Sequence, residues 1–229
     1  MKERSQELFL NRVFLREHKT RFLCSVELEG QEVECYIPAS CKLSKFVDLS
    51  GKQVILQPVK KSEARTHYAV YAAKFGRSYI LLNLAEANRI VEEQLYRRYF
   101  SFLGKRKRIH REYTVEGYKT DLFIEDTNTL IEVKTLLAFN QEGCFPSMNS
   151  KRAVQQLEKI SSLLDSGYKV CYIILSLNSA VAVVKVNSAL REYYRLFQEC
   201  LRKGMDCRGF SVKLKDIKPE IYGKVEIRM

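Results

Sequence analysis

The chain has 229 residues, 46% of them hydrophobic, which suffices for one large domain or two small ones whose core needs no disulfide. Its net charge of +12 favours a polyanionic partner, nucleic acid above all. The seven cysteines are scattered and form no CxxC pair, so they predict reduced thiols in a cytosol rather than a disulfide framework or a zinc site.

No segment of the sequence predicts membrane insertion or secretion. The first ten residues, MKERSQELFL, carry charges and lack the apolar core of a signal peptide. The longest apolar run, VCYIILSL, is far shorter than the roughly 20 residues that a membrane helix needs. We therefore expect a soluble, cytoplasmic protein without a membrane partner.

The first third of the chain, from Val13 to about Leu82, has the period-two pattern of short β-strands. A Glu29-Gly30 turn joins two of them into a predicted hairpin. The predicted strands lie within RFLCSVELEG, QEVECYIP, KQVILQPV, HYAVYAAKF and RSYILLNL. Five short strands in succession fit a small β-barrel, and the OB-fold and an SH3-like barrel are both compatible with the pattern.

Aromatic residues in the predicted barrel could stack on nucleic-acid bases, as they do in OB-folds that bind single strands. Because aromatic residues at strand spacing usually belong to the core, we expect most of them to be buried. The five residues concerned are Tyr36, Tyr68, Tyr71, Phe75 and Tyr79.

Near Leu84 the period changes from two to helical, which predicts a domain boundary. The apolar stripe of the first helix comprises Ala87, Val91, Leu95, Tyr99 and Phe102. A later helix starts at Asn149 or Ser150, two strands lie in 168–176 and 180–186, a helix near 188–203 ends at Gly204, and a last strand covers 209–214. The pattern predicts an α+β two-domain chain, with an OB-like domain at 1–84 and an α/β domain at 85–229.

The segment KTDLFIEDTNTLIEVKT, residues 119–135, predicts a hairpin that carries three charges. A four-residue turn at 126–129 would pair Asp121 with Lys134 and place Glu132 on the same face. Two carboxylates on one rigid face suit Mg²⁺, and Lys134 could hold the attacking water or the pentacovalent phosphate. The alternative is an exposed Asp121–Lys134 salt bridge on a solvated hairpin.

The spacing of these residues, an Asp followed ten residues later by Glu-Val-Lys, resembles the core motif of PD-(D/E)XK nucleases. Further blocks along the chain resemble the sugar fermentation stimulation protein A family. These blocks are RFLCSVEL, NLAEANRIVEEQL, IEVKTLL, FPSMNSKRAVQQL, GYKVCYIIL and RKGMDC. The resemblance implies a DNA-binding protein with an N-terminal OB-like domain and a C-terminal PD-(D/E)XK nuclease-like domain.

The resemblance also assigns candidate site residues. Asp121 and Glu132 match the metal carboxylates, Lys134 matches the motif lysine, and Glu93 matches an acid in the preceding helix. These four would form the catalytic set, with weakly bound Mg²⁺ or Mn²⁺ held by the three acids. Glu92 is an alternative to Glu93, and Glu112 could match another family acid. The chain departs from the family pattern at Lys119, Thr120, Ser147, Gln155 and Gln156, which bears on binding specificity and on activity.

The run KRKRIHR between the first helix and the hairpin predicts a nucleic-acid surface, because each neutralised phosphate releases counterions. A solvated connector is the alternative explanation for such a run. The predicted contact residues are Lys105, Arg106, Lys107, Arg108, Arg111 and, at the start of the following helix, Arg152.

Together these features predict a nucleic-acid-binding protein, with DNA as the implied nucleic acid and a Mg²⁺-dependent site that hydrolyses phosphodiesters. One alternative is a non-catalytic, DNA-binding transcriptional regulator of sugar metabolism that retains a nuclease scaffold. Another is a basic interaction module that does not bind nucleic acid. A resemblance in fold cannot by itself choose between cleavage and binding.

Overall fold

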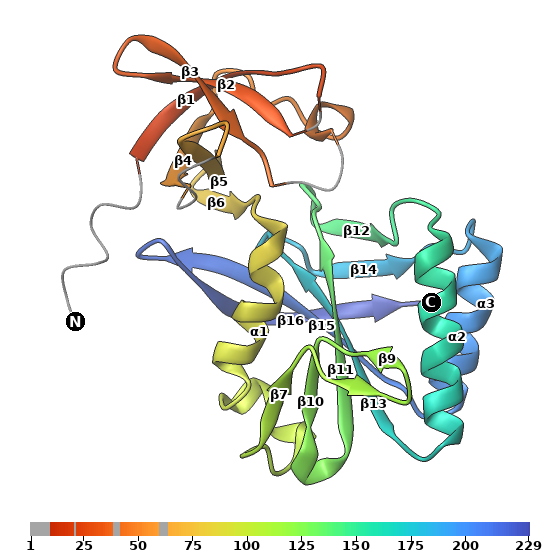
Figure 1. The fold of residues 1–229 in the computed structure, drawn as a ribbon. Helices are drawn as coiled ribbons and strands as arrows, with labels where there is room; N and C mark the ends of the chain where they lie inside the picture. Colours follow the sequence, from red (N-terminus) through yellow and green to blue (C-terminus); the bar gives the residue numbers. More distant parts are fainter. Residues whose placement is uncertain (1–9, 21, 39–41, 60–63) are drawn as a thin grey trace. The chain divides into compact units, whose positions relative to one another are not determined.

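The computed structural model describes residues 10–20, 22–38, 42–59 and 64–229, and the chain divides into two compact units (Figure 1). The first unit extends to Glu86 and also includes Val212–Glu220. The second comprises Ala87–Ser211 and Ile221–Met229. The change of period near Leu84 predicts a single second domain at 85–229. The structure differs at 212–220, where Tyr71 of the first unit donates a hydrogen bond to the carbonyl of Ile217 at 3.4 Å.

The first unit is an OB-like barrel. Its strands pair in the order β3-β2-β1-β4-β5-β6, and a parallel pairing of Tyr36 with Ala69 between β3 and β5 closes five of them into a barrel. Buried aliphatic side chains such as Val26, Ile37 and Val70 fill it. The strands are β1 Leu10–Glu17, β2 Leu23–Leu28, β3 Gln31–Tyr36, β4 Gln53–Pro58, β5 Tyr68–Phe75 and β6 Ser78–Leu81, with a 3₁₀ turn, η1, at Leu43–Lys45.

The barrel confirms the predicted fold, although its five strands are not the five that were predicted. The predicted strands correspond to β2–β6, whereas β1–β5 form the closed barrel and β6 extends the sheet. Strand β1, LNRVFLRE, was missed because polar residues interrupt its alternation. The Glu29-Gly30 turn is present as predicted, and both residues have positive φ, 55° and 79°, as a type I′ hairpin turn requires.

The barrel aromatics are more exposed than expected. Only Tyr71 is fully buried, at 3% exposure. Tyr36 is 38% exposed and stacks on Phe22 with ring centroids 6.2 Å apart. Tyr68, Phe75 and Tyr79 are half-buried.

The second unit is a mixed α/β domain built on one eight-stranded sheet, in the order β12-β14-β16-β15-β13-β11-β10-β7. The central strands β11, β13 and β15 are parallel, whereas β10 is antiparallel to both of its neighbours. The strands are β7 Ile109–Arg111, β10 Leu122–Ile124, β11 Thr129–Leu136, β12 Glu142–Phe145, β13 Lys169–Ser176, β14 Val183–Val186, β15 Asp206–Lys215 and β16 Lys218–Arg228; β8 Thr114–Val115 and β9 Tyr118–Lys119 form a separate hairpin.

The helices are α1 Ala87–Gln94, α2 Lys151–Asp165 and α3 Arg191–Arg202, with 3₁₀ turns η2 Leu84–Glu86, η3 Arg98–Leu103 and η4 Glu125–Thr127. Ser150, not Asn149, caps α2: its hydroxyl accepts a hydrogen bond from the Ala153 N–H at 3.3 Å. The apolar side of α2 packs with α3 and with alternate residues of β11 and β13 in one core. Burial of one leucine, such as Leu157, stabilises this packing by roughly 1.5–3 kcal/mol.

Five strands of the second unit were not predicted, namely β7, β8, β9, β12 and β16. Strand β16 follows the segment that was expected to be the last strand, and β12 was assigned to no element. Strand β12 alternates regularly but is only four residues long and contains Gly143, whereas β16 alternates irregularly between buried and exposed residues, so each gives a weak local signal. Within the described part of the chain, no helix has the length and apolar content to cross a membrane. The six cysteines in the described ranges are free thiols, and Cys41 lies outside those ranges.

Candidate functional site

The register of the β10–β11 hairpin places three charged residues on one face. Leu122 pairs with Ile131 and Ile124 with Thr129, so the turn occupies 125–128, one residue earlier than predicted. Continuing this register sets Asp121 opposite Glu132 instead of Lys134. The sum of the paired residue numbers falls by two, so the parity of the side chains is kept and would still place all three charges on one face. Asp121 itself lies one residue before β10, and its carboxylate accepts a hydrogen bond from the Val133 N–H of β11.

Two features explain the position of this turn. Asn128 adopts a left-handed conformation with φ 52°, which ends the short η4 turn. The Asp126 carboxylate accepts hydrogen bonds from the backbone N–H groups of Lys107 and Arg108, both at 2.7 Å. These contacts bind the turn to a segment almost 20 residues earlier, so the hairpin sequence alone could not predict the register.

Glu132 is a buried carboxylate with three hydrogen-bond donors. It is 3% exposed, and burial raises its pKa while the nearby Lys134 ammonium opposes that rise. The Tyr118 hydroxyl donates to Oε2 at 2.5 Å, and Lys134 Nζ donates to Oε1 at 2.5 Å. The Gln156 amide donates to Oε1 as well, and to the Tyr118 hydroxyl at 3.0 Å. These donors offset the cost of burying the charge.

Asp121 lies beside Glu132 and is held from two sides. Its Oδ1 accepts a hydrogen bond from Asn88 Nδ2 of α1 at 2.8 Å, and its Oδ2 accepts one from the Val133 N–H at 2.8 Å. Each carboxylate oxygen has two lone pairs, so one acceptor position on each oxygen of Asp121 has no protein donor in these contacts.

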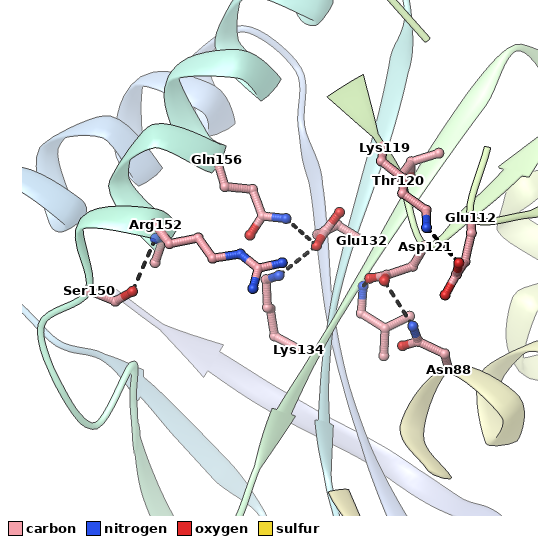
Figure 2. A pocket seen from close by; sticks show the side chains of 12 residues that line it. Asn88, Glu112, Lys119, Thr120, Asp121, Glu132, Lys134, Ser150, Arg152 and Gln156 are labelled. Carbon is pink, nitrogen blue, oxygen red and sulfur yellow. Dashed lines mark hydrogen bonds and ion pairs between the residues drawn. The ribbon is translucent and has the colours of Figure 1, made fainter. Parts of the chain in front are cut away.

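The two carboxylates line an open cleft of 440 Å³ (Figure 2). Its walls come from α1, from the β9–β11 region and from the first turns of α2, and Glu112 adds a third acid. Glu112 is paired with Lys119 at 2.6 Å, and that hydrogen bond lowers the pKa of Glu112. The lining residues are Asn88, Glu112, Lys119, Thr120, Asp121, Glu132, Val133, Lys134, Ser150, Arg152, Ala153 and Gln156.

Cationic groups face the carboxylates across the cleft. Figure 2 shows the Arg152 side chain extending from α2 toward Lys134 and Glu132. The Arg152 side chain is exposed and makes no hydrogen bond or ion pair with any residue that the structure describes. The N-terminus of α2 also lines the cleft and adds the positive end of the helix dipole. The cleft therefore offers a carboxylate pair next to an anion-binding wall.

The structure does not bring Glu93 to this cleft. Glu93 is exposed and pairs with Arg89 one helical turn earlier, at 2.7 Å, while Glu92 pairs with Arg111 at 3.2 Å. The residue that α1 contributes is Asn88. An amide carries no charge, so a search for acidic ligands passes over it.

Two further residues of the site, Tyr118 and Gln156, were not assigned a role from the sequence. Gln156 departs from the family pattern, and the pattern assigns no function to a glutamine at this position. Tyr118 lies in the β8–β9 hairpin, three residues before Asp121, and no periodic pattern marks it. Their role becomes visible only through their hydrogen bonds to Glu132.

Most side chains of the predicted basic surface at 105–108 form hydrogen bonds or ion pairs within the protein. Arg106 donates to the carbonyls of Leu95 and Gly104, at 2.6 and 2.5 Å. Asp126 pairs with Lys105 at 3.3 Å and with Arg108 at 3.6 Å, and Arg108 also pairs with Glu125.

The backbone hydrogen bonds from Arg108 and Lys107, with the Lys105 ammonium, lower the pKa of Asp126 to about 2. Of the four side chains at 105–108, only that of Lys107 has no such partner among the described residues. None of the four lines the cleft, and neither does Arg111. Of the six predicted contact residues, Arg152 alone does.

No group of three or more His, Cys, Asp or Glu side chains in the described ranges is arranged to hold a metal ion. A cation bound by Asp121 and Glu132 would take its remaining ligands from other oxygen atoms, such as backbone carbonyls, water or substrate. This is the donor set expected for a weakly bound hard cation.

Comparisons with known proteins agree on one family. The model of the sugar fermentation stimulation protein RE domain matches residues 85–218, more than half of the chain. A sugar fermentation stimulation protein homolog from Acetivibrio thermocellus is 24% identical over 199 residues, 85% of each chain. A homolog from Synechococcus sp. is 26% identical over 211 residues, covering 90% of this chain and 87% of that protein.

A solved structure, that of Pyrococcus furiosus SfsA in complex with Ca²⁺, shares the fold. Its TM-score is 0.81 at 17% identity, and the match covers 100% of both chains. The two-domain architecture, a closed barrel followed by a mixed α/β domain, is thus that of a known protein. The chain belongs to the sugar fermentation stimulation protein family.

Proposed function

We propose that this protein binds DNA and hydrolyses phosphodiester bonds in the cleft of Asp121, Glu132 and Lys134, with one weakly bound divalent cation. The observation that carries the proposal is the cleft itself, where the Asp121 and Glu132 carboxylates and the cationic side chains of Lys134 and Arg152 line one open volume of 440 Å³. Carboxylates suit a hard cation, and the cationic groups suit phosphate.

The residues present fit such a cation. Asp121 has an open acceptor position on each oxygen, and Glu132 Oε2 accepts only the Tyr118 hydrogen bond among the contacts found. The Ca²⁺ complex of the structural neighbour supports a hard divalent ion in this fold, and Mg²⁺ or Mn²⁺ suits the same oxygen ligands. When bound, the cation would polarise a phosphate oxygen and make a bound water more acidic.

The cationic side chains would act on the phosphate. Lys134 is three-quarters buried, so its charge is screened little by solvent and can stabilise the additional negative charge of a pentacovalent phosphate. Arg152 can form two parallel hydrogen bonds to phosphate oxygens and so fix the substrate. Tyr118 and Gln156 keep the Glu132 carboxylate in one orientation, which limits reorganisation during the reaction.

One observation favours a second candidate, a protein that binds DNA without cleaving it. Lys134 and Gln156 both donate to Glu132 Oε1 and so occupy both acceptor positions of that oxygen. In this state Glu132 is neutralised from within the protein. A nuclease fold kept in this state would serve as a DNA-binding scaffold, as in a transcriptional regulator.

The test is incubation of the purified full chain with duplex DNA, single-stranded DNA and RNA, with Mg²⁺, with Mn²⁺ or with a chelator. We expect cleavage that requires metal and that the Lys134→Ala variant loses, whereas a Glu158→Gln variant on the exposed side of α2 keeps it. DNA binding without cleavage by the unaltered protein would favour the second candidate. Absence of any nucleic-acid binding would refute both.

A further inference from the structure

An exposed tyrosine lies on the edge of the sheet next to the cleft. The ring of Tyr113 stacks on Phe123 with centroids 4.9 Å apart and an angle of 8° between the planes. His110 flanks both rings, at 5.2 Å from Tyr113 and 6.3 Å from Phe123. Phe123 is 7% exposed, whereas Tyr113 is 42% exposed. One side of the Tyr113 ring therefore covers the core, and the remainder is accessible.

This ring cluster lies on the same face of the sheet as the carboxylates. Phe123 pairs with Leu130, two residues before Glu132 in β11, so the Phe123 and Glu132 side chains point to one face and are diagonal neighbours about 7–8 Å apart. His110 is the direct cross-strand neighbour of Phe123. The Tyr113 carbonyl accepts a hydrogen bond from the N–H of Thr120, a residue that lines the cleft, at 2.9 Å.

We propose that Tyr113 is a base-stacking subsite, which receives an unpaired nucleobase next to the phosphate held in the cleft. The inference rests on the proposed function, because the cleft must first bind the nucleic-acid backbone. An aromatic face stacks on any base without regard to sequence. Bases inside a duplex have both faces covered by their neighbours, so a fixed exposed ring selects single-stranded or locally opened nucleic acid.

The stacked geometry favours this role over that of a simple cover for the core. Phe123 and His110 fix the plane of the Tyr113 ring, so little side-chain freedom is lost when a base stacks on it. Lys134 and Arg152 in the adjoining cleft supply the charge that a nucleotide phosphate needs.

The experiment measures binding of a fluorescent single-stranded DNA and of the matching duplex to the full chain, in chelator so that no strand is cut. The variants are Tyr113→Ala, Tyr113→Leu and Tyr113→Phe, with Tyr96→Ala as the control because Tyr96 is also exposed and lies away from the cleft. Leucine keeps an apolar cover over Phe123 and lacks an aromatic face, so it separates stacking from packing.

We expect Tyr113→Ala and Tyr113→Leu to weaken single-strand binding roughly tenfold. Duplex binding should stay within twofold of the unaltered protein, and Tyr113→Phe and Tyr96→Ala should bind both DNAs as it does. Single-strand binding by Tyr113→Leu that equals that of the unaltered protein would overturn the subsite, as would an equal loss for both DNAs. If the unaltered protein binds neither DNA, the proposed function fails together with the subsite.

Discussion

Replacing Lys134 with alanine should strengthen metal binding even as it removes cleavage. In the structure Lys134 donates to Glu132 Oε1 at 2.5 Å, and the side chains are 24% and 4% exposed, so the ion pair is largely shielded from solvent. A cation that binds the same carboxylate must compete with this ammonium. The residue that assists chemistry in the proposed function thus opposes metal binding in the free protein.

The magnitude follows from the contact that is removed. A hydrogen bond to a charged group contributes about 1.5–3 kcal/mol. Without that competitor the affinity for Mn²⁺ should rise about 10- to 100-fold, because 1.4 kcal/mol corresponds to a factor of ten. Removing Lys134 also takes away an interaction that lowers the pKa of the buried Glu132. The titration is therefore run at two pH values, so that a change in the protonation of Glu132 appears as a pH-dependent difference between the two proteins.

Calorimetric titration of Mn²⁺ into the unaltered protein, Lys134→Ala and Lys119→Ala is the decisive assay. Lys119→Ala is the matched control, since it removes one positive charge from the same cleft without touching Glu132. A gain confined to Lys134→Ala supports direct competition. An equal rise in Mn²⁺ affinity in both variants would mean that the effect comes from the net charge of the cleft. An unchanged or weaker Mn²⁺ affinity in Lys134→Ala would refute the reasoning.

Four further predictions test the site and its surroundings. Tyr118→Phe should lower the free energy of unfolding in urea by about 1.5–3 kcal/mol, because Glu132 loses a buried donor, whereas Tyr96→Phe should not. Glu93→Gln should leave Mn²⁺ affinity unchanged, since Glu93 pairs with Arg89 away from the cleft; a large loss would restore Glu93 as a ligand. Asp126 has a pKa of about 2, below its usual 3.8, so it stabilises the fold above about pH 4 and that contribution is lost as pH falls through 2. Asp126→Asn should therefore be less stable than the unaltered protein at neutral pH, with the difference vanishing near pH 2 in acid-unfolding curves. Arg152→Ala should reduce the slope of log affinity for DNA against log salt by about 1, and an unchanged slope would place phosphate binding elsewhere.

Local patterns in the sequence were sufficient for most of the elements. Period-two alternation identified β2–β6, and helical periodicity with a polar cap identified α2. The parity of the hairpin at 119–135 was also local, because any turn of even length keeps Asp121, Glu132 and Lys134 on one face. These features can be predicted from the sequence because each depends on residues that are close in the sequence.

Only the tertiary structure determines the contacts between segments that are distant in the sequence. Asn88 and Gln156 reach the carboxylates from α1 and α2, 33 and 24 residues away from their partners. Asp126 fixes the register of the hairpin and neutralises part of the basic run at 105–108. Most side chains of this run, which were predicted to contact nucleic acid, therefore form contacts within the domain instead. Whether a charge is buried or paired depends on which segments contact each other in the folded chain, and the composition of the sequence does not predict those contacts.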